Sequence, residues 1–256
     1  MMISIDMYAY ASKLKDINPM EKLALAFITL CVCLWANSII ISLAVLLIMT
    51  WSTIYQGGIP GTVYLKLLLI PMGFLILGVL TIAIEITPQP YEFLGSIYFF
   101  NFYLGVSKAG LITATQLFFR ALGAVSCLYY LSLNTPMMDV MSALRKLRCP
   151  KLLVEMMSLI YRFIFVFIAT AETMIIAQSS RLGYSGILSG YRSLGTLISS
   201  IFIRSYQQAD KIYTSLESRG YDGELNVLEQ HKAYSLIGYL KVFGINIFLI
   251  SLTAII

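Results

Sequence analysis

The chain has 256 residues, of which 59% are hydrophobic and only 12% are charged. Soluble globular domains are about half apolar and about a quarter charged, so this composition excludes a water-soluble protein, and a chain this apolar is not disordered either. The formal net charge of +5 does not indicate nucleic-acid binding, because the basic residues are few and dispersed among apolar runs. The composition predicts an integral membrane protein.

The charged residues divide the chain into four parts. Residues 1–22 carry six charges, residues 23–135 carry five, residues 136–232 carry nineteen and residues 233–256 carry one. We therefore expect a cytoplasmic N-terminal segment, a membrane domain of about four spans, a cytoplasmic domain of helices and a final transmembrane helix. This is an all-α integral membrane fold with about five transmembrane helices.

The first apolar run follows a signal for the start of a helix. Asn18 stands where an N-cap would, Pro19 is at the first helical position and Glu21 comes three residues after the cap. The run from Leu23 to Trp51 is long for one crossing of about 20 residues, and Asn37-Ser38 interrupts it. We interpret it as two short helices that turn at Asn37; a single long span is the alternative.

Three further spans are predicted along the chain, and loops or charged segments separate them. They cover residues 64–86, 110–133 and 234–256. Basic residues precede the first run and follow the fourth predicted helix, and Lys and Arg beside spans mark the cytoplasmic side. Both basic flanks lie on one side only if the first run forms two helices. We expect a multi-pass protein of the inner (plasma) membrane with a cytoplasmic N-terminus.

Helices joined by Pro and Gly are predicted in the charged part. Residues 136–148 form a short amphipathic helix in this interpretation, and residues 152–178 form a long one of roughly 40 Å. Three charges interrupt the long helix, so we expect it outside the bilayer; a membrane crossing is the alternative. Four glycines between residues 183 and 195 predict a flexible connection or bend, and a last helix is expected over residues 193–219.

The sequence carries no recognisable catalytic or metal-binding constellation. It has no Gly-Lys dipeptide of the kind that ends a nucleotide-binding loop, and His231 is the only histidine, so no histidine cluster can hold a transition metal. Asp222 and Glu224 are close together but are expected in a solvated polar loop. We predict no enzyme activity, no metal site and no cofactor in this chain.

Arg120 lies near the middle of a predicted span. An intramembrane charge costs a few kcal/mol and usually marks an ion pair or a functional pathway. One interpretation is that carbonyl groups or Glu85 satisfy the guanidinium within the bundle. The other is that Arg120 takes part in a conformational change.

Two of the predicted cytoplasmic helices end in similar sequences, 38 residues apart. The first end reads Ser180-Arg181-Leu182-Gly183 and the second reads Ser218-Arg219-Gly220-Tyr221. The negative end of the helix dipole favours an arginine at such a position, and this is the simplest interpretation of either residue taken alone. Two such arginines in one membrane protein favour a functional interpretation.

These two ends, together with three other segments, resemble the cobalt-type branch, CbiQ, of the T components of energy-coupling factor (ECF) transporters. The other segments are Ile5-Asp6-Met7-Tyr8-Ala9-Tyr10, Pro19-Met20-Glu21-Lys22-Leu23, and Thr135-Pro136 followed by Asp139-Val140-Met141-Ser142-Ala143-Leu144 and Cys149-Pro150. The resemblance covers most of the chain. The family favours Ala-Arg-Gly in both motifs, so Ser180, Ser218 and Leu182 depart from it while both arginines are kept.

The resemblance implies a non-catalytic subunit of an importer. In the family, these helix ends dock on two cytoplasmic ABC ATPase subunits, which bind ATP and Mg, and the membrane helices hold a substrate-binding S component. It implies that Arg181 and Arg219, with the neighbouring Ser180, Ser218, Gly183 and Gly220, couple the ATPases to transport. Cobalt is the implied substrate, in connection with cobalamin biosynthesis; nickel or a vitamin is the alternative.

Two other classes of function stay open beside this one. A membrane-embedded lipid-modifying enzyme would need a catalytic motif near the membrane interface, and the sequence offers none. A self-contained secondary carrier would need a repeat of spans and polar residues at the midplane, which the predicted arrangement of four spans and one final span lacks.

Overall fold

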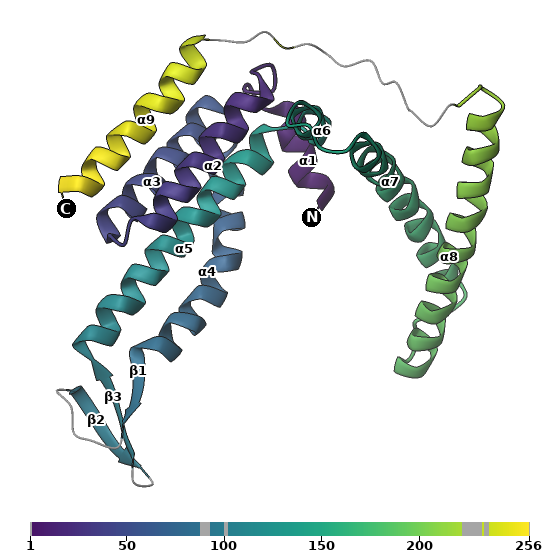
Figure 1. Ribbon diagram of the computed structural model, residues 1–256. Helices are drawn as coiled ribbons and strands as arrows, with labels where there is room; N and C mark the ends of the chain where they lie inside the picture. Colours follow the sequence, from purple (N-terminus) through teal and green to yellow (C-terminus); the bar gives the residue numbers. More distant parts are fainter. Residues whose placement is uncertain (1, 88–92, 100–101, 222–231, 233–235, 256) are drawn as a thin grey trace. The chain divides into compact units, whose positions relative to one another are not determined.

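The structure is a computed structural model that describes residues 2–87, 93–99, 102–221, 232 and 236–255 (Figure 1). The chain divides into two compact units: unit 1 comprises Met1–Val140 and His231–Ile256, and unit 2 comprises Met141–Gln230. The predicted helical membrane fold is confirmed. The described residues include four helices long and apolar enough to cross a membrane, with a shorter apolar helix beside them: Ile39–Gln56, Gly61–Ala83, Lys108–Asn134 and Lys151–Ser180, and the shorter Gly238–Thr253.

Unit 1 opens with α1 (Met2–Ala11), a helix that we did not predict, followed by α2 (Pro19–Trp35) and α3 (Ile39–Trp51). The predicted break at Asn37 is confirmed, because neither helix includes it. The predicted helix start is confirmed as well: Asn18 is the N-cap of α2, and its side chain accepts a hydrogen bond from the backbone N–H of Met20 at 3.0 Å.

The rest of unit 1 consists of the π-helical η1 (Ser52–Gln56), α4 (Gly61–Ala83), α5 (Lys108–Asn134) and α9 (Leu236–Ile255). The predicted span 64–86 ends early, at Ala83, where a strand begins. A small antiparallel sheet in the order β1-β3-β2 connects α4 to α5. All other regular secondary structure in the described residues is helical. Its strands are β1 (Ile84–Thr87), β2 (Phe93–Phe99) and β3 (Phe102–Ser107), with Ile84 opposite Val106 and Phe99 opposite Phe102.

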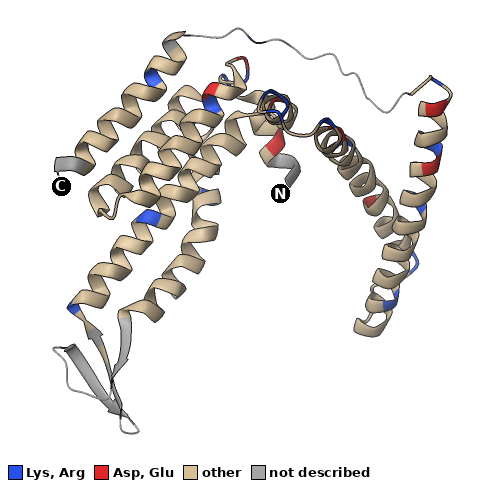
Figure 2. Ribbon diagram, viewed as in Figure 1, with Lys and Arg blue, Asp and Glu red and all other residues tan. Residues whose placement is uncertain are grey.

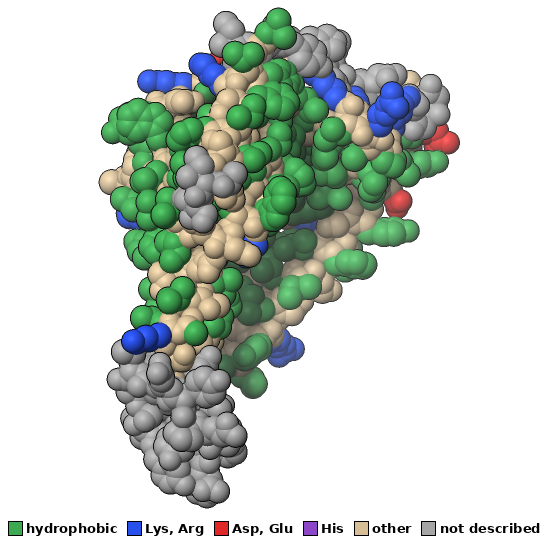
Figure 3. All heavy atoms as spheres, turned by 60° about the vertical axis from the view of Figure 1, so that its left-hand side comes forward, with side chains coloured by type: hydrophobic (Ala, Val, Ile, Leu, Met, Phe, Trp, Pro, Cys, Tyr) green, Lys and Arg blue, Asp and Glu red, His purple; other side chains and the backbone are tan. Residues whose placement is uncertain are grey.

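The core of unit 1 lies where α2, α3, α5 and α9 pack together. Ile41, Val45 and Met49 of α3 are fully buried there. Gly123 of α5 allows close packing, because a Cβ at this position would lie 2.9 Å from the Sγ of Cys33 and 3.1 Å from a backbone oxygen of α3. Figure 3 shows hydrophobic side chains over much of the visible face of the molecule, as expected for a surface that faces lipid.

Buried polar contacts gather at one end of unit 1, which we call the basic end (Figure 2). Lys22 is buried, and its ammonium donates hydrogen bonds to the backbone oxygens of Leu14, at 3.0 Å, and Asn134, at 2.9 Å. Lys232 forms an ion pair with Asp139. These contacts join the start of α2, the end of α5, the start of α6 and the residue that precedes α9 in the described chain.

Unit 2 contains most of α6 (Met137–Lys146) and all of α7 (Lys151–Ser180) and α8 (Ile187–Glu217). The two helices predicted over 136–148 and 152–178 are found. The last predicted helix begins six residues early, and the prediction of a flexible connection is wrong for Gly190, which lies inside α8; Gly195 lies inside it as the predicted helix required. The physical reason is tertiary: the hydroxyls of Ser189 and Ser193 donate to the backbone oxygen of Gly183 at 2.9 and 2.8 Å and tie α8 to the end of α7.

Candidate functional site

The two arginine motifs form the same backbone structure. At the end of each helix, two backbone N–H groups fold back to the last turn in the pattern of a Schellman motif. In α7 the bonds run from Gly183 to Gln178 at 2.8 Å and from Leu182 to Ser179 at 3.0 Å; in α8 they run from Tyr221 to Leu216 and from Gly220 to Glu217, both at 3.0 Å.

Arg181 and Arg219 occupy the same place in this structure, directly before a residue with left-handed backbone. That residue is Leu182, with φ of 57°, after Arg181 and Gly220, with φ of 73°, after Arg219. Both arginines are exposed. The sequence similarity between the two helix ends therefore corresponds to a repeated three-dimensional arrangement.

Ser180 and Ser218 are equivalent as well. The hydroxyl of Ser180 donates to the backbone oxygen of Ile176 at 3.0 Å, and that of Ser218 donates to the backbone oxygen of Thr214 at 2.6 Å. Each serine thus directs its proton into its own helix four residues back. A serine held in this way leaves the exposed arginine beside it free of that hydroxyl, although exposed Glu217 precedes Ser218 at the second end.

The surroundings of the two ends differ. Near Arg181, the side chain of Gln178 donates to the backbone oxygen of Ser193 at 3.1 Å and accepts from the hydroxyl of Tyr184 at 2.7 Å. A Cβ at Gly183 would lie 2.7 Å from the Oγ of Ser193, whereas one at Gly220 would meet nothing within 4 Å. Gln178, Tyr184 and Ser193 were not predicted as part of the site, because they share no local spacing and meet only when α8 folds back on α7.

The structure does not bring Arg181 and Arg219 together. Arg181 lies at the turn that joins α7 to α8, and Arg219 lies beyond the far end of α8 (Figure 1). The 31 residues of α8 separate them by roughly 46 Å at 1.5 Å per residue. The geometry therefore presents two separate exposed arginines at opposite ends of one helical hairpin.

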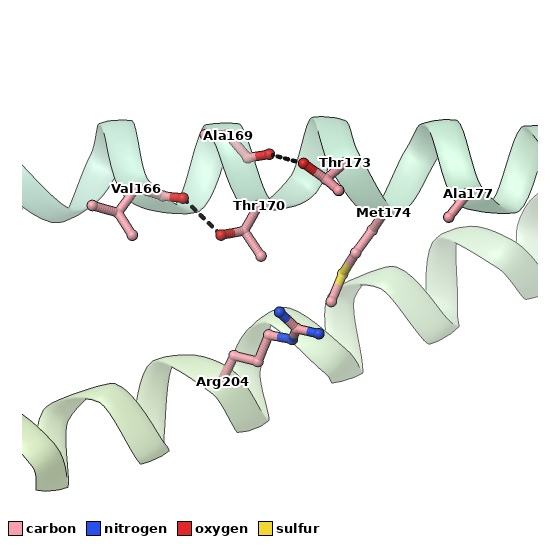
Figure 4. Close-up of a pocket in the computed structure, with 7 residues that line it drawn as sticks. All are labelled: Val166, Ala169, Thr170, Thr173, Met174, Ala177 and Arg204. Carbon is pink, nitrogen blue, oxygen red and sulfur yellow. Dashed lines mark hydrogen bonds between the residues drawn. The ribbon is translucent and has the colours of Figure 1, made fainter.

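An apolar groove runs between α7 and α8. It has a volume of about 680 Å³ near the end of α8, and its lining includes Met156, Ile160, Phe163, Phe167, Ile212 and Tyr213. A second hollow of about 620 Å³ places Arg204 of α8 opposite Thr170, Thr173 and Met174 of α7 (Figure 4). Both threonine hydroxyls donate to their own helix, at 2.8 and 2.9 Å. An open apolar surface of this extent marks contact with lipid or with another protein.

Arg120, the predicted intramembrane charge, lies in unit 1. It is half-buried, and its Nη1 donates to the side-chain oxygen of Asn37 at 3.0 Å. The side chain of Glu85, its other expected partner, lies outside what the structure describes, as do His231, Asp222 and Glu224. In the described part of the chain, no three His, Cys, Asp or Glu residues form a group that could hold a metal ion.

Comparison with known proteins finds one family over most of the chain. Residues 11–230 match the family described as CbiQ, cobalt transport protein. An uncharacterised protein of Methanocaldococcus jannaschii is 34% identical over 248 residues, 97% of this chain and 91% of its own length. The cobalt transport protein CbiQ of Salmonella typhimurium is 34% identical over 158 residues, 62% of this chain and 70% of its own.

A third relative connects the chain to a wider group. The energy-coupling factor transporter transmembrane protein EcfT of Lactococcus lactis subsp. cremoris is 27% identical over 138 residues, 50% of this chain and 52% of its own. The matched family region includes both arginine motifs. Together with its apolar helices, this similarity makes the chain a multi-pass membrane component of a transporter that works with other subunits. The chain belongs to the CbiQ family of cobalt transport proteins.

Proposed function

We propose that the chain is the transmembrane coupling (T) subunit of an ECF-type ABC importer for cobalt. In this proposal, two cytoplasmic ATPases bind ATP and Mg, and unit 2 transmits their motion to a membrane S component that binds the substrate. The observation that carries the proposal is the repeated placement of Arg181 and Arg219, each exposed before a left-handed residue at the end of a long helix.

The geometry of these arginines suits two partners. A guanidinium at a helix end can bind a carboxylate through two parallel hydrogen bonds, and sites roughly 46 Å apart along α8 can be occupied by two subunits at once. The helices between them are continuous, so motion at one end is transmitted along the hairpin. The apolar groove between α7 and α8 would then be covered by protein, with α7 on the cytoplasmic side.

The sharpest test replaces both arginines by alanine. Truncating one partner of a buried charge pair costs about 2–5 kcal/mol, and at about 1.4 kcal/mol per tenfold the lower figure weakens docking by roughly 25-fold. We expect the Arg181→Ala/Arg219→Ala chain to remain in the membrane, to lose co-purification with the ATPases and to lose cobalt uptake. Lysine at both positions should restore uptake only in part, because an ammonium lacks the planar fork.

Arg192 provides the matched control, because it is an exposed arginine of α8 that belongs to neither motif. Arg192→Ala should leave ATPase association and uptake near the wild-type level. If the two arginines only favour their helix dipoles, the double variant loses under about 1 kcal/mol of stability and transports normally. Wild-type uptake by the double variant, with the partners present, would refute the coupling role.

The same uptake assay tests which metal is transported. Competition between labelled cobalt and unlabelled nickel, measured with all subunits present, separates these substrates. Uptake of nickel in preference to cobalt would contradict the cobalt assignment and would leave the coupling role untouched.

A further inference from the structure

The turn between α2 and α3 lies beside the middle of α5 (Figure 1). Two α5 side chains hold it there: Arg120 Nη1 donates to the side-chain oxygen of Asn37 at 3.0 Å, and Gln116 Nε2 donates to the backbone oxygen of the same residue. The thiol of Cys33 also donates to the backbone oxygen of Arg120 at 3.7 Å. The turn is therefore fixed to the middle of α5.

Helix lengths give the depth of this turn. The 2.9 Å hydrogen bond between Lys22 and Asn134 places the start of α2 and the end of α5 at one level, the basic end. At 1.5 Å per residue, Lys22 to Asn37, just past the end of α2, is about 22 Å, and Asn134 back along α5 to Arg120 is about 21 Å. Two independent helices thus agree on the distance.

That distance is short of a membrane crossing. The hydrocarbon layer is about 30 Å thick, so a hairpin that starts at the basic end stops roughly 8 Å before the other surface. The α4 helix, with 23 residues, and the α5 helix, with 27 residues, both exceed this thickness, at about 34 and 40 Å. The α4–α5 pair therefore reaches the far surface, which we call the sheet end. Ile39–Gln56 is by itself long enough to cross, but the turn of the α2–α3 hairpin is held at the level of Arg120 and stops short of that surface.

The alternative is to place the turn between α2 and α3 at the membrane surface. The charged and apolar side chains of unit 1 argue against it. It would move the charged basic end, including Lys22 and the Lys232–Asp139 pair, about 8 Å into hydrocarbon. It would also expose the outer half of α4 to water, where Phe74 is 79% and Leu77 is 66% exposed. Both changes are costly, so the hairpin ends within the membrane.

Polar groups at this depth need partners, because each unsatisfied one costs several kcal/mol in hydrocarbon. The Nε of Arg120 is buried and has no hydrogen-bond partner among the described residues, although the guanidinium as a whole is half-buried. Trp35, beside the turn, is 84% exposed, and tryptophan favours the level of the lipid headgroups. We call Trp35, Asn37, Gln116 and Arg120 the polar notch.

We propose that the polar notch binds the phosphate of a phospholipid from the leaflet at the sheet end, drawn inward beside the short hairpin. The guanidinium of Arg120 supplies the positive charge, and the amide of Gln116 lies one helical turn away. Thinning of the bilayer beside a short hydrophobic segment is one response to such a mismatch. The proposal requires only that unit 1 lies in a membrane, so it stands apart from the coupling function.

The two tryptophans of the chain, Trp35 and Trp51, allow the depth to be measured. Trp51→Phe leaves Trp35 as the only reporter, reconstituted in bilayers whose lipids carry bromine either near the headgroup or near the chain ends. We expect bromine near the headgroup to quench Trp35 more strongly. Adding Arg120→Gln should shift the stronger quenching to bromine near the chain ends; an unchanged depth would overturn the proposal.

Retained lipid gives an independent readout. Native mass spectrometry of the detergent-purified chain should show bound phospholipid, and Arg120→Gln should reduce it about fivefold, the factor that corresponds to about 1 kcal/mol for one cation near an anionic headgroup. Arg120→Lys keeps the charge and should retain most of the lipid, which separates binding from a folding defect. Arg192→Gln, in α8, is the control and should retain all of it.

Inorganic phosphate distinguishes the source of the anion. Added to the purified chain, it should not displace the retained phospholipid, because the acyl chains also contact the apolar surface beside the notch. Displacement by inorganic phosphate alone would show that the notch takes a free anion, and the lipid assignment would be wrong. Equal lipid retention by wild type and Arg120→Gln would overturn the site itself.

Discussion

Leu182 is the residue at which the two arginine motifs differ most in physical terms. Its φ of 57° is in the left-handed region, where the equivalent residue of the second motif is Gly220. A side chain with a Cβ costs about 1–2 kcal/mol in this conformation. The first motif keeps it because Gln178 and Ser193 hold the turn from both sides.

We predict that Leu182→Gly stabilises the end of α7. The gain should be about 0.5–1 kcal/mol, because the relief of left-handed strain is partly offset by the greater entropy of glycine in the unfolded chain. Amide hydrogen exchange at residues 182 and 183 measures it directly, since these two N–H groups close the motif, and exchange should slow. The mirror change, Gly220→Leu, should speed exchange at residues 220 and 221. Faster exchange in Leu182→Gly would contradict this account of the strain.

Among the elements, α5 crosses α2 and α3 closely at a glycine. A Cβ at Gly123 would lie 2.9 Å from the Sγ of Cys33 and 3.1 Å from the backbone oxygen of Ser42. The backbone oxygen cannot rotate away, so a larger residue must push the helices apart. Close approach through small residues is a common source of helix association in membranes.

We therefore expect Gly123→Ala to destabilise unit 1 by about 1–3 kcal/mol, the range for overpacking a well-packed core. Gly73→Ala in α4 is the matched control, because a Cβ there meets nothing within 4 Å. Unfolding of the detergent-solubilised chain, followed by circular dichroism, should show a lower midpoint for the first variant and an unchanged or higher one for the second. Equal midpoints would mean that the crossing is looser than its distances indicate.

For the whole molecule, the proposed function predicts the side of the membrane on which α7 and α8 lie. Helix α7 has the length and composition of a membrane span, yet the coupling role requires unit 2 to be cytoplasmic. In a chain without its native cysteines, a cysteine at position 97 should react with an impermeant thiol reagent from outside, and one at position 187 should not. Ile187 is 84% exposed, so burial does not explain a lack of reaction. Labelling at 187 from outside would mean that α7 crosses the membrane.

The isolated chain should bind neither cobalt nor nickel tightly and should not hydrolyse ATP. The reason is chemical: the sequence has a single histidine and lacks a nucleotide-binding loop, so these activities belong to partner subunits in the proposed complex. Titration calorimetry with each metal, on the purified chain, measures this. Micromolar binding of either metal would assign a metal site to the chain and would require a different mechanism.

The sequence by itself determined the class of protein and much of its helical order. Its composition predicts a membrane protein, because too few charges are present to cover a soluble surface. Local signals placed the start of α2 at Asn18 and the break at Asn37, and both signals act within a few residues of the chain. The arginine motifs were visible for the same reason, since helix ends are encoded by neighbouring residues.

Only the tertiary structure decided which distant residues meet. Arg120 and Asn37 are 83 positions apart, and Lys22 and the carbonyl of Asn134 are 112 apart. Neither contact follows from periodicity, because a helical repeat gives the face of a residue and not the element packed against that face. The early start of α8 was missed for a related reason: its two glycines favour a loop locally, and the bonds of Ser189 and Ser193 to the end of α7 outweigh that preference.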